Sequence, residues 1–435
     1  SHVVYTWLSQ IPDNEVKKNP ELCLLLAWIY FLKGEYSSYK RWISLAKNIV
    51  NRTKSDRCRL LGIQKAIQAA YNSEINQFRN ALEDSRQALV LLPKKEIYWR
   101  LSVAVTLGVA YLSFGELDKA ERSLRYAIAK SKPIAFHLAS IASYGYLAQV
   151  EIARCNYVSA YEICNQCLRY IEENDQKQLS VSSYIYLPLL HTVYEMNLLN
   201  EAEDILISRI AIDKTENNYH FLILLTLFRV RLEIAKNNIN KANELLIGAR
   251  RLIEEHQAVH SANEFHALEA LLCLKIDGTI PNKKLNPKKI KKELQNNLII
   301  PREPEYFSYI EILVFQKQLS NAFNMLDLIT ERIRNSQLIL FKMKASLWKS
   351  VLLYLSGENE KAVEELEMIL PIARLNKMKR IFLDIGDPIQ HILSSTQERH
   401  QEYRQYIQEI LREFPTQFPQ KDVSAFGLTK REVDV

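Results

Sequence analysis

Two groups of residues have the types and spacing that metal or redox chemistry uses. Cys164 and Cys167 form a C-x-x-C pair, and His256 and His260 have the i, i+4 spacing that places both imidazoles on one face of a helix. His266 follows nearby. A zinc site needs about four ligands, and neither a second cysteine pair nor an H-E-x-x-H sequence occurs in the chain. We therefore expect the cysteines to be core residues and the histidines to lie at a solvated helix end, and we assign no metal site.

The remaining candidates for chemistry are charged groups. Carboxylates such as Glu254 and Glu255 are numerous, but no nucleophile, base and orienting group can be assembled into a catalytic set. Neither G-x-x-x-x-G-K-[ST] nor G-x-G-x-x-G occurs, so the chain has no phosphate-binding loop of these kinds. Six lysines between Lys283 and Lys292 could contact DNA phosphates, although such runs are usually solvated loops. The sequence predicts no catalytic residue, no enzyme activity and no cofactor held by this chain.

Glycine and proline are scarce, which favours long helices. The 435 residues include 10 glycines and 13 prolines, where average usage gives roughly 30 and 22. A barrel, a sandwich or a doubly wound sheet needs more turn residues than this. The net charge of +7 is modest, no apolar run reaches the roughly 18 residues that cross a bilayer, and the six cysteines are scattered. We expect an all-α, cytoplasmic protein with reduced thiols and no membrane partner.

An alanine recurs with a nearly constant period, at the start of an apolar helical stripe. Successive copies are separated by 39, 40, 42, 40, 80 and 40 positions, and Tyr39 precedes the first copy by 42 positions. The gap of 80 leaves room for one degenerate unit, which contains Pro281 and Pro287 and is expected to hold a loop or irregular insert. This gives nine repeats between about positions 20 and 376. We call the recurring position the anchor, and all repeats except the degenerate one have an anchor residue: Tyr39, Ala81, Ala120, Ala160, Ala202, Ala242, Ala322 and Ala362.

Two other offsets repeat with the anchors. Five residues before them, six of eight positions are Gly or Asn, although these types form only about 9% of the chain: Gly34, Asn76, Gly115, Cys155, Asn197, Asn237, Lys317 and Gly357. Gly and Asn adopt the left-handed conformation that ends a helix, so this offset predicts a turn. Twelve residues before the anchors, five of eight residues are small, which lets two helices approach closely: Ala27, Ala69, Gly108, Ala148, Leu190, Val230, Ile310 and Ser350.

Each repeat is therefore predicted to be two antiparallel helices joined by a short turn. The clearest copy is 101–128, LSVAVTLGVAYLSFGELDKAERSLRYAI, which has residues at the positions typical of tetratricopeptide repeats. HEAT-type helix pairs have a similar period and are the structural alternative. Either arrangement stacks into a solenoid in which each pair is buried only by its neighbours. The predicted fold is all-α, a right-handed superhelix of tetratricopeptide-like repeats with a period of about 40.

The first helices of such repeats line the inside of a superhelix. Side chains at offsets −18, −15, −11 and −8 from each anchor are expected to point inward, and in one unit they are Ser102, Val105, Val109 and Leu112. Aromatic rings beside hydrogen-bonding groups could hold a small polar effector such as a sugar; a water-filled groove that binds nothing is the alternative for any single residue. The candidate effector-groove residues are Gln149, Tyr184, His191, Tyr194, Arg231, Glu311, Lys344 and Tyr354.

Several segments resemble one family. Five segments are similar to recurring segments of the large ATP-dependent LuxR-type transcriptional regulators, the family of the maltose-regulon activator. They are the opening residues 7–34, SRQALVLLP (85–93), LGVAYLSFGELDKAERSL (107–124), RIFLDIGDPI (380–389) and the ending AFGLTKREVDV. The ending matches the L-T-x-R-E that opens the LuxR-type helix-turn-helix, and its Thr and Glu have the spacing of a capping box. The matching residues are Leu428, Thr429, Arg431 and Glu432.

The resemblance implies a domain organisation and a function. We expect a helical-repeat sensor domain over 1–413, a linker over 414–427 and the truncated start of the helix-turn-helix over 428–435. The family's ATPase module, which uses ATP, would lie upstream in a longer parent protein. Binding of a small-molecule effector or an inhibitory protein to the superhelix would then control self-association of the parent and DNA binding through the missing C-terminal domain. The alternative function is a tetratricopeptide scaffold for protein partners, with no small-molecule ligand.

Overall fold

The predicted helix pairs form every repeat except the degenerate one in the computed structural model, which describes residues 11, 13–51, 56–177, 180–258, 261–276, 278, 290–292, 294 and 298–414. The first helices of the repeats, here the A helices, are α3 (Pro20–Lys33), α5 (Arg57–Glu74), α7 (Ile97–Ser113), α9 (His137–Ala153), α11 (Ser183–Glu195), α13 (Tyr219–Ala235), α15 (Ala262–Ile276), α17 (Glu303–Phe315) and α19 (Ile339–Leu355). The second, or B, helices are α4 (Tyr36–Val50), α6 (Phe78–Leu91), α8 (Leu117–Ser131), α10 (Tyr157–Glu173), α12 (Leu199–Thr215), α14 (Ile239–His256), α18 (Leu319–Ile333) and α20 (Asn359–Glu367).

Backbone dihedral angles confirm the predicted turns. All eight residues five positions before the anchors have a positive φ, from 58° at Lys317 to 80° at Gly357. A second series, which the sequence did not reveal, joins each of four B helices to the next A helix. Its residues lie 15 positions after an anchor and also have positive φ: Ala135, Asp175, Asn217 and Gln257. Their types share no preference for this conformation, so only the structure shows the regularity.

The anchor residues and the residues twelve positions before them are all buried. Gly108 shows why small side chains are needed there. A Cβ atom on Gly108 would lie 2.6 Å from the Leu124 side chain of the paired B helix, so the two helices pack closer than an alanine permits. The B helices bury a single stripe, as in α8, where the buried residues are spaced by three and four: Leu117, Ala120, Leu124, Ala127 and Ser131.

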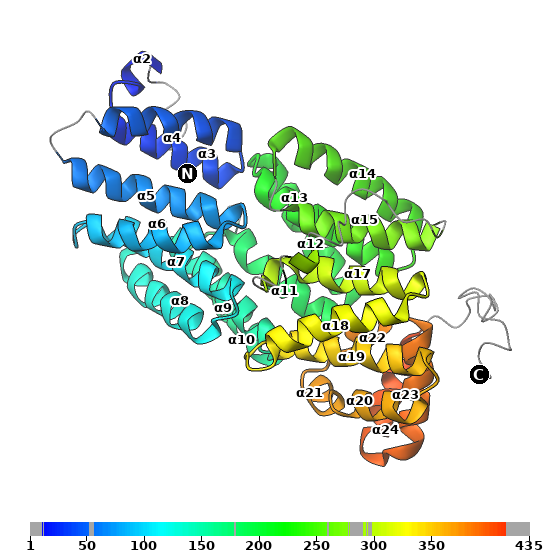
Figure 1. The fold of residues 1–435 in the computed structure, drawn as a ribbon. Coiled ribbons are helices and arrows are strands. Elements are labelled where there is room, and N and C mark those ends of the chain that lie inside the picture. The colour runs from blue at the N-terminus through cyan, green and yellow to red at the C-terminus, as the bar shows by residue number, and fades with distance from the viewer. Residues whose placement is uncertain are drawn as a thin grey trace.

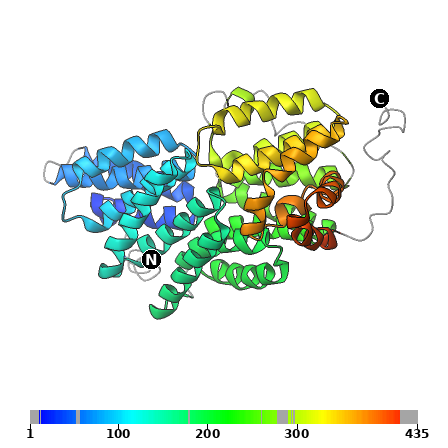
Figure 2. The same ribbon diagram turned by 90° about the horizontal axis from the view of Figure 1, so that it is seen from below.

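The A helices form the inner layer of a curved wall. Each packs against the A helices of the neighbouring repeats and, apart from α15, against the B helix of its own repeat. These contacts explain why most sides of α9 are buried. The remaining face of an A helix is turned to the interior of the superhelix. Figures 1 and 2 show the wall winding so that the blue N-terminal helices come to lie beside the green part of the chain, where α3 contacts α13.

Contacts between successive turns of the superhelix join residues 186 to 223 positions apart, or about five repeats. Asn218 Nδ2 donates to the carbonyl of Leu32 at 3.4 Å, and Gln337 Nε2 donates to Asp118 Oδ2 at 3.1 Å. The backbone N–H of Ile381 donates to Glu195 Oε1 at 2.7 Å. The interior is therefore enclosed by contacts between turns.

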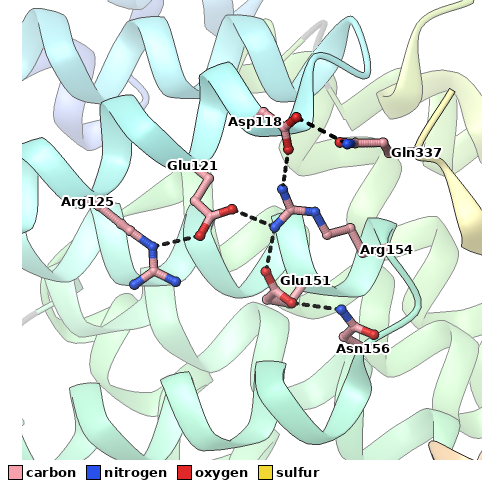
Figure 3. A network of polar contacts seen from close by, with 7 residues as sticks. All are labelled: Asp118, Glu121, Arg125, Glu151, Arg154, Asn156 and Gln337. Atoms are coloured by element: carbon pink, nitrogen blue, oxygen red, sulfur yellow. Dashed lines mark hydrogen bonds and ion pairs between the residues drawn. The ribbon is translucent and has the colours of Figure 1, made fainter.

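A polar network reinforces one of these contacts (Figure 3). The Arg154 guanidinium, in the turn after α9, lies 2.8 Å from Asp118, 2.6 Å from Glu121 and 2.8 Å from Glu151. Asp118 in turn accepts the hydrogen bond from Gln337 on the next turn of the superhelix. An analogous pair recurs further along the chain, where Lys236 lies 2.5 Å from Glu203. The network thus ties adjacent repeats together and connects them to the following turn.

The degenerate repeat and the C-terminal end depart from the pattern. After α15 the described residues include Ile290 and Leu294, both buried in a hydrophobic core, while residues 281–289 of the expected insert lie outside the described residues. After α20 come α21 (Leu370–Leu375), α22 (Arg380–Leu383), α23 (Asp387–Arg399) and α24 (Arg404–Glu413), which share one core with α19 and α20. Shorter helical elements are α2 (Asp13–Val16), η1 (Lys132–Ile134), η2 (Ser180–Ser182), η4 (Ile300–Arg302) and η5 (Gln401–Tyr403).

Phe414, the last described residue, is still buried against this C-terminal core. The rest of the predicted linker and the residues of the terminal motif, Leu428, Thr429, Arg431 and Glu432, lie outside the described residues. Among the helices of the described part, none combines the length and hydrophobicity that a bilayer crossing requires.

Candidate functional site

A group of charged side chains interacts electrostatically in the second half of the superhelix. Five A helices contribute to it, and so do α22 and the turn that follows α22. Their residues lie on α11, α13, α15, α17 and α19, with the last two members at 380 and 384. We call this group the inner charged cluster: Glu195, Arg231, Glu264, Glu303, Glu311, Lys344, Arg380 and Asp384. His191 and Tyr194, also on α11, are electrostatically coupled to it.

Most members of the cluster are paired. Arg231 lies 3.2 Å from Glu264, and Lys344 lies 2.5 Å from Glu303. The Tyr194 hydroxyl donates to Asp384 at 3.0 Å. Arg380 forms an ion pair with the same carboxylate and stacks over the Tyr194 ring at 5.3 Å. Except for Arg380 with Asp384, which lie one helical turn apart, each pair joins different segments of the wall, so the cluster holds the helices of this half in register.

Two predicted groove residues have no such partner among the described residues. Glu311 is half-buried and makes no hydrogen bond or ion pair, and burial raises its pKa to about 7 despite the opposing charge of Lys275. His191 packs edge-on against Phe228, with ring centroids 5.0 Å apart. Burial lowers the pKa of His191 to about 3, and the cations Arg231 and Lys344 act in the same direction. A neutral imidazole and a carboxyl group that is easily protonated are thus available for hydrogen bonds to a ligand.

An apolar pocket lies on the inner surface of the first half. Its lining comes from α3, α5, α7, α9 and α11 and includes Ser102, Val105 and Val109, three of the positions expected to point inward. Tyr184 also lines it, with its ring 5.8 Å from that of Tyr146. Leu112, which was expected to point inward as well, is instead buried in the main hydrophobic core.

The eight candidate groove residues therefore fall into different environments. His191, Tyr194, Arg231, Glu311 and Lys344 belong to or adjoin the inner charged cluster, and Tyr184 lines the apolar pocket. Tyr354 lies apart, because its ring stacks on His391 of α23 at 6.1 Å. Gln149 is half-buried on α9.

Sequence reasoning missed five members of the cluster. Glu195 stands at offset −7 from Ala202, one position from the predicted offset of −8. Glu264 stands at offset −18 from position 282, where the degenerate repeat would have its anchor, so the offset rule already contained its signal. Glu303 stands at offset −19 from Ala322, one position from the predicted offset. Arg380 and Asp384 come from a segment about five repeats further along the chain, and only the winding of the superhelix places them beside Tyr194.

The other candidates for chemistry are structural. Cys164 and Cys167 are fully buried in the main core, as expected, and burial raises the pKa of Cys164 to about 12. His256 is the last residue of α14, at a helix end as expected, but it is half-buried and its ring stacks on Tyr219 with centroids 3.6 Å apart. His266 contacts the ring of Phe265, and His260 lies outside the described residues.

The carboxylates Glu254 and Glu255 lie within the described residues, and so does part of the lysine run. Glu254 and Glu255 are exposed, and of the lysine run only Lys291 and Lys292 are described, half-buried and exposed respectively. Within the described residues, no group of three or more His, Cys, Asp or Glu side chains could hold a metal ion.

Comparisons with known proteins agree with the helical-repeat architecture. A family model described as the MalT-like TPR region matches residues 62–399. The HTH-type transcriptional regulator MalT of Vibrio cholerae serotype O1 is 20% identical over 401 residues, which cover 89% of this chain and 43% of that protein. The chain thus spans less than half the length of this curated relative.

Two solved structures are more distant. Apo RapI is 14% identical, with a TM-score of 0.40, over 71% of this chain and 96% of that chain. A Rap protein complexed with competence and sporulation factor is 10% identical, with a TM-score of 0.46, over 91% of this chain and 97% of that chain. The family model, by contrast, matches well over half of the sequence, and the chain therefore belongs to the family of MalT-like TPR regions.

Proposed function

We propose that this chain is the effector-sensing region of an ATP-dependent LuxR-type transcription activator and that the inner charged cluster binds the effector. The single observation that carries the proposal is the arrangement of polar groups on the inner surface. Glu311 and His191 have no hydrogen-bond partner among the described residues, yet they lie beside the ion pairs that hold this half of the superhelix together. A ligand that bonds to them also touches the groups that link the repeats.

The chemistry of the cluster defines the effector class. The cluster contains both donors and acceptors, with Arg231 and Lys344 among the donors and Glu264, Glu303 and Asp384 among the acceptors. A small neutral or zwitterionic molecule rich in hydroxyl groups is complementary to such a surface. We further propose that the chain is not an enzyme, that it holds no cofactor, and that ATP use and DNA binding belong to other parts of the parent protein.

Effector binding would act by favouring one of two arrangements of the superhelix. Tyr194 and Glu195 join the cluster to residues 379–384. Lys379 and Asn197 in turn contact Glu413, at the end of the last described helix. A change at the cluster therefore has a contiguous route to the C-terminal end of the domain.

A thermal-shift screen of the purified 435-residue chain against polar metabolites tests the proposal. A ligand present at 100 times its dissociation constant stabilises the folded state by about 2.7 kcal/mol. We expect a hit whose shift is lost in Arg231→Gln and kept in Arg86→Gln, which changes an exposed arginine on α6. No shift from any metabolite, combined with a clear shift from a protein partner, would instead establish the scaffold function.

The gene of the parent protein offers an independent check. The proposal expects a P-loop ATPase module upstream of this region and a complete helix-turn-helix downstream. Absence of either module from the reading frame would contradict the assignment to an ATP-dependent activator.

A further inference from the structure

The apolar pocket has walls suited to a flat ligand. Trp28 and Phe31 of α3 stack with ring centroids 5.3 Å apart and belong to its lining. Tyr146 and Tyr184 line it from α9 and α11, and Val109 of α7 contributes further apolar surface. The empty volume is about 580 Å³, the part open to solvent included. Four aromatic side chains in the lining favour a planar aromatic molecule.

The pocket has no uncompensated charge to offer a ligand. Glu74 is the one ionisable acid or base among its lining residues in the described chain, tyrosines aside. Its carboxylate lies 3.0 Å from His220 Nδ1. Burial opposes a charged imidazole at this position, but Glu74 outweighs it and raises the pKa of His220. Since the pair compensates itself, a charged ligand would lose its hydration without gaining a partner.

One buried hydroxyl in the pocket lacks a hydrogen bond. Ser73 is 8% exposed, and its Oγ has no partner in the described structure. The neighbouring hydroxyls are already used, because Ser102 and Thr106 each donate to a backbone carbonyl one helical turn earlier at 3.1 Å. An unmade hydrogen bond of a buried group is costly, so a ligand that supplies a donor or acceptor to Ser73 is favoured.

We propose that this pocket is a second binding site and that it takes a neutral, planar aromatic molecule carrying one hydroxyl or a similar hydrogen-bonding group. The ring packs against the aromatic side chains of the lining, and the Ser73 hydroxyl, whose Oγ is closed to solvent in the unliganded structure, rotates to bond the polar group. The site is distinct from the inner charged cluster, so it stands whichever effector the cluster binds.

Isothermal titration calorimetry of the full chain with four indoles tests the ligand class. The probes are indole-3-ethanol, 3-ethylindole, tryptamine and indole-3-propionate, which share a ring and differ in the end group. We expect indole-3-ethanol to bind most tightly, with the cation and the anion each weaker by at least about tenfold because their charge is desolvated. Absence of saturable binding, or equal affinity for the charged probes, would overturn the proposal.

Variants locate the site. Ser73→Ala should weaken indole-3-ethanol by about three- to tenfold, the value of one hydrogen bond, and leave 3-ethylindole unchanged. Val109→Phe should fill the pocket and abolish binding of both, with circular dichroism to check folding and Val105→Phe as a second filling variant. Arg231→Gln, in the inner charged cluster, should change neither. Unaltered binding by the folded filling variants would place the indoles elsewhere and refute the site.

Discussion

Gly145 and Gly248 form a matched pair that tests the packing of the wall. Both lie inside helices, so replacing either by alanine gains about 1 kcal/mol of helix propensity. An added Cβ on Gly248 meets nothing within 4 Å, whereas one on Gly145 would lie 2.3 Å from the carbonyl oxygen of Tyr184. Pro188, inside α11, has no N–H to bond that oxygen. Gly145 thus allows α9 to approach a carbonyl that its own helix leaves free.

The steric cost follows from these distances. Real Cβ contacts shorter than 3.0 Å essentially do not occur. In Gly145→Ala the added Cβ and the Tyr184 carbonyl oxygen must therefore move apart by at least 0.7 Å, the difference between 3.0 and 2.3 Å, through a shift of α9, α11 or both. Overpacking of this kind costs about 1–3 kcal/mol. Because the helix-propensity gain is common to both variants, the difference between their free energies of unfolding should equal this cost. Urea unfolding measures it, and equal stability of Gly145→Ala and Gly248→Ala would refute the packing argument.

Three further perturbations have definite outcomes. Gly357→Ala should lower the free energy of unfolding by about 1–2 kcal/mol through backbone strain alone, because φ is 80° and the space is open; an unchanged urea midpoint would contradict this. Burial raises the pKa of Glu195 from 4.5 to about 7, so this carboxyl destabilises the folded chain increasingly as pH rises between those values. Glu195→Gln should leave the melting temperature nearly unchanged at pH 4.5 and raise it at pH 8, where the gain in the free energy of unfolding is up to about 3 kcal/mol. An equal effect at both pH values would show that the group does not titrate as described. Arg154→Gln, which removes three carboxylate contacts, should cost more stability than the same change at the more exposed Arg125, and calorimetry of the two variants compares them directly.

Local rules made the repeats predictable. A turn needs a residue that accepts positive φ, and close helices need small residues, so Gly, Asn and Ala at fixed offsets predicted both. The turn at Lys317 shows the limit of residue type, because its φ of 58° is imposed by the neighbouring helices and not by lysine. The series at Ala135 and Gln257 escaped detection for the same reason.

The inner surface was only partly predictable. Offsets within a repeat identified Arg231, Glu311 and Lys344, since the interior face of an A helix is a local property of that helix. Contacts between turns depend instead on the pitch of the superhelix, a sum of small rotations over about five repeats, and no single repeat encodes it. The contact of Tyr194 with Asp384 therefore could not be predicted from the sequence, although both residues stood in segments already considered.

The most direct test of the central claim is the dissociation constant of the effector found by screening, measured calorimetrically for the wild-type chain and three variants. If the inner charged cluster is the effector site, Glu311→Gln and Arg231→Gln should each weaken binding by about tenfold or more, as expected when a charged hydrogen-bond partner is removed. Arg86→Gln should leave the constant unchanged. Equal affinity for all four proteins would contradict the account, because the effector would then bind outside the cluster.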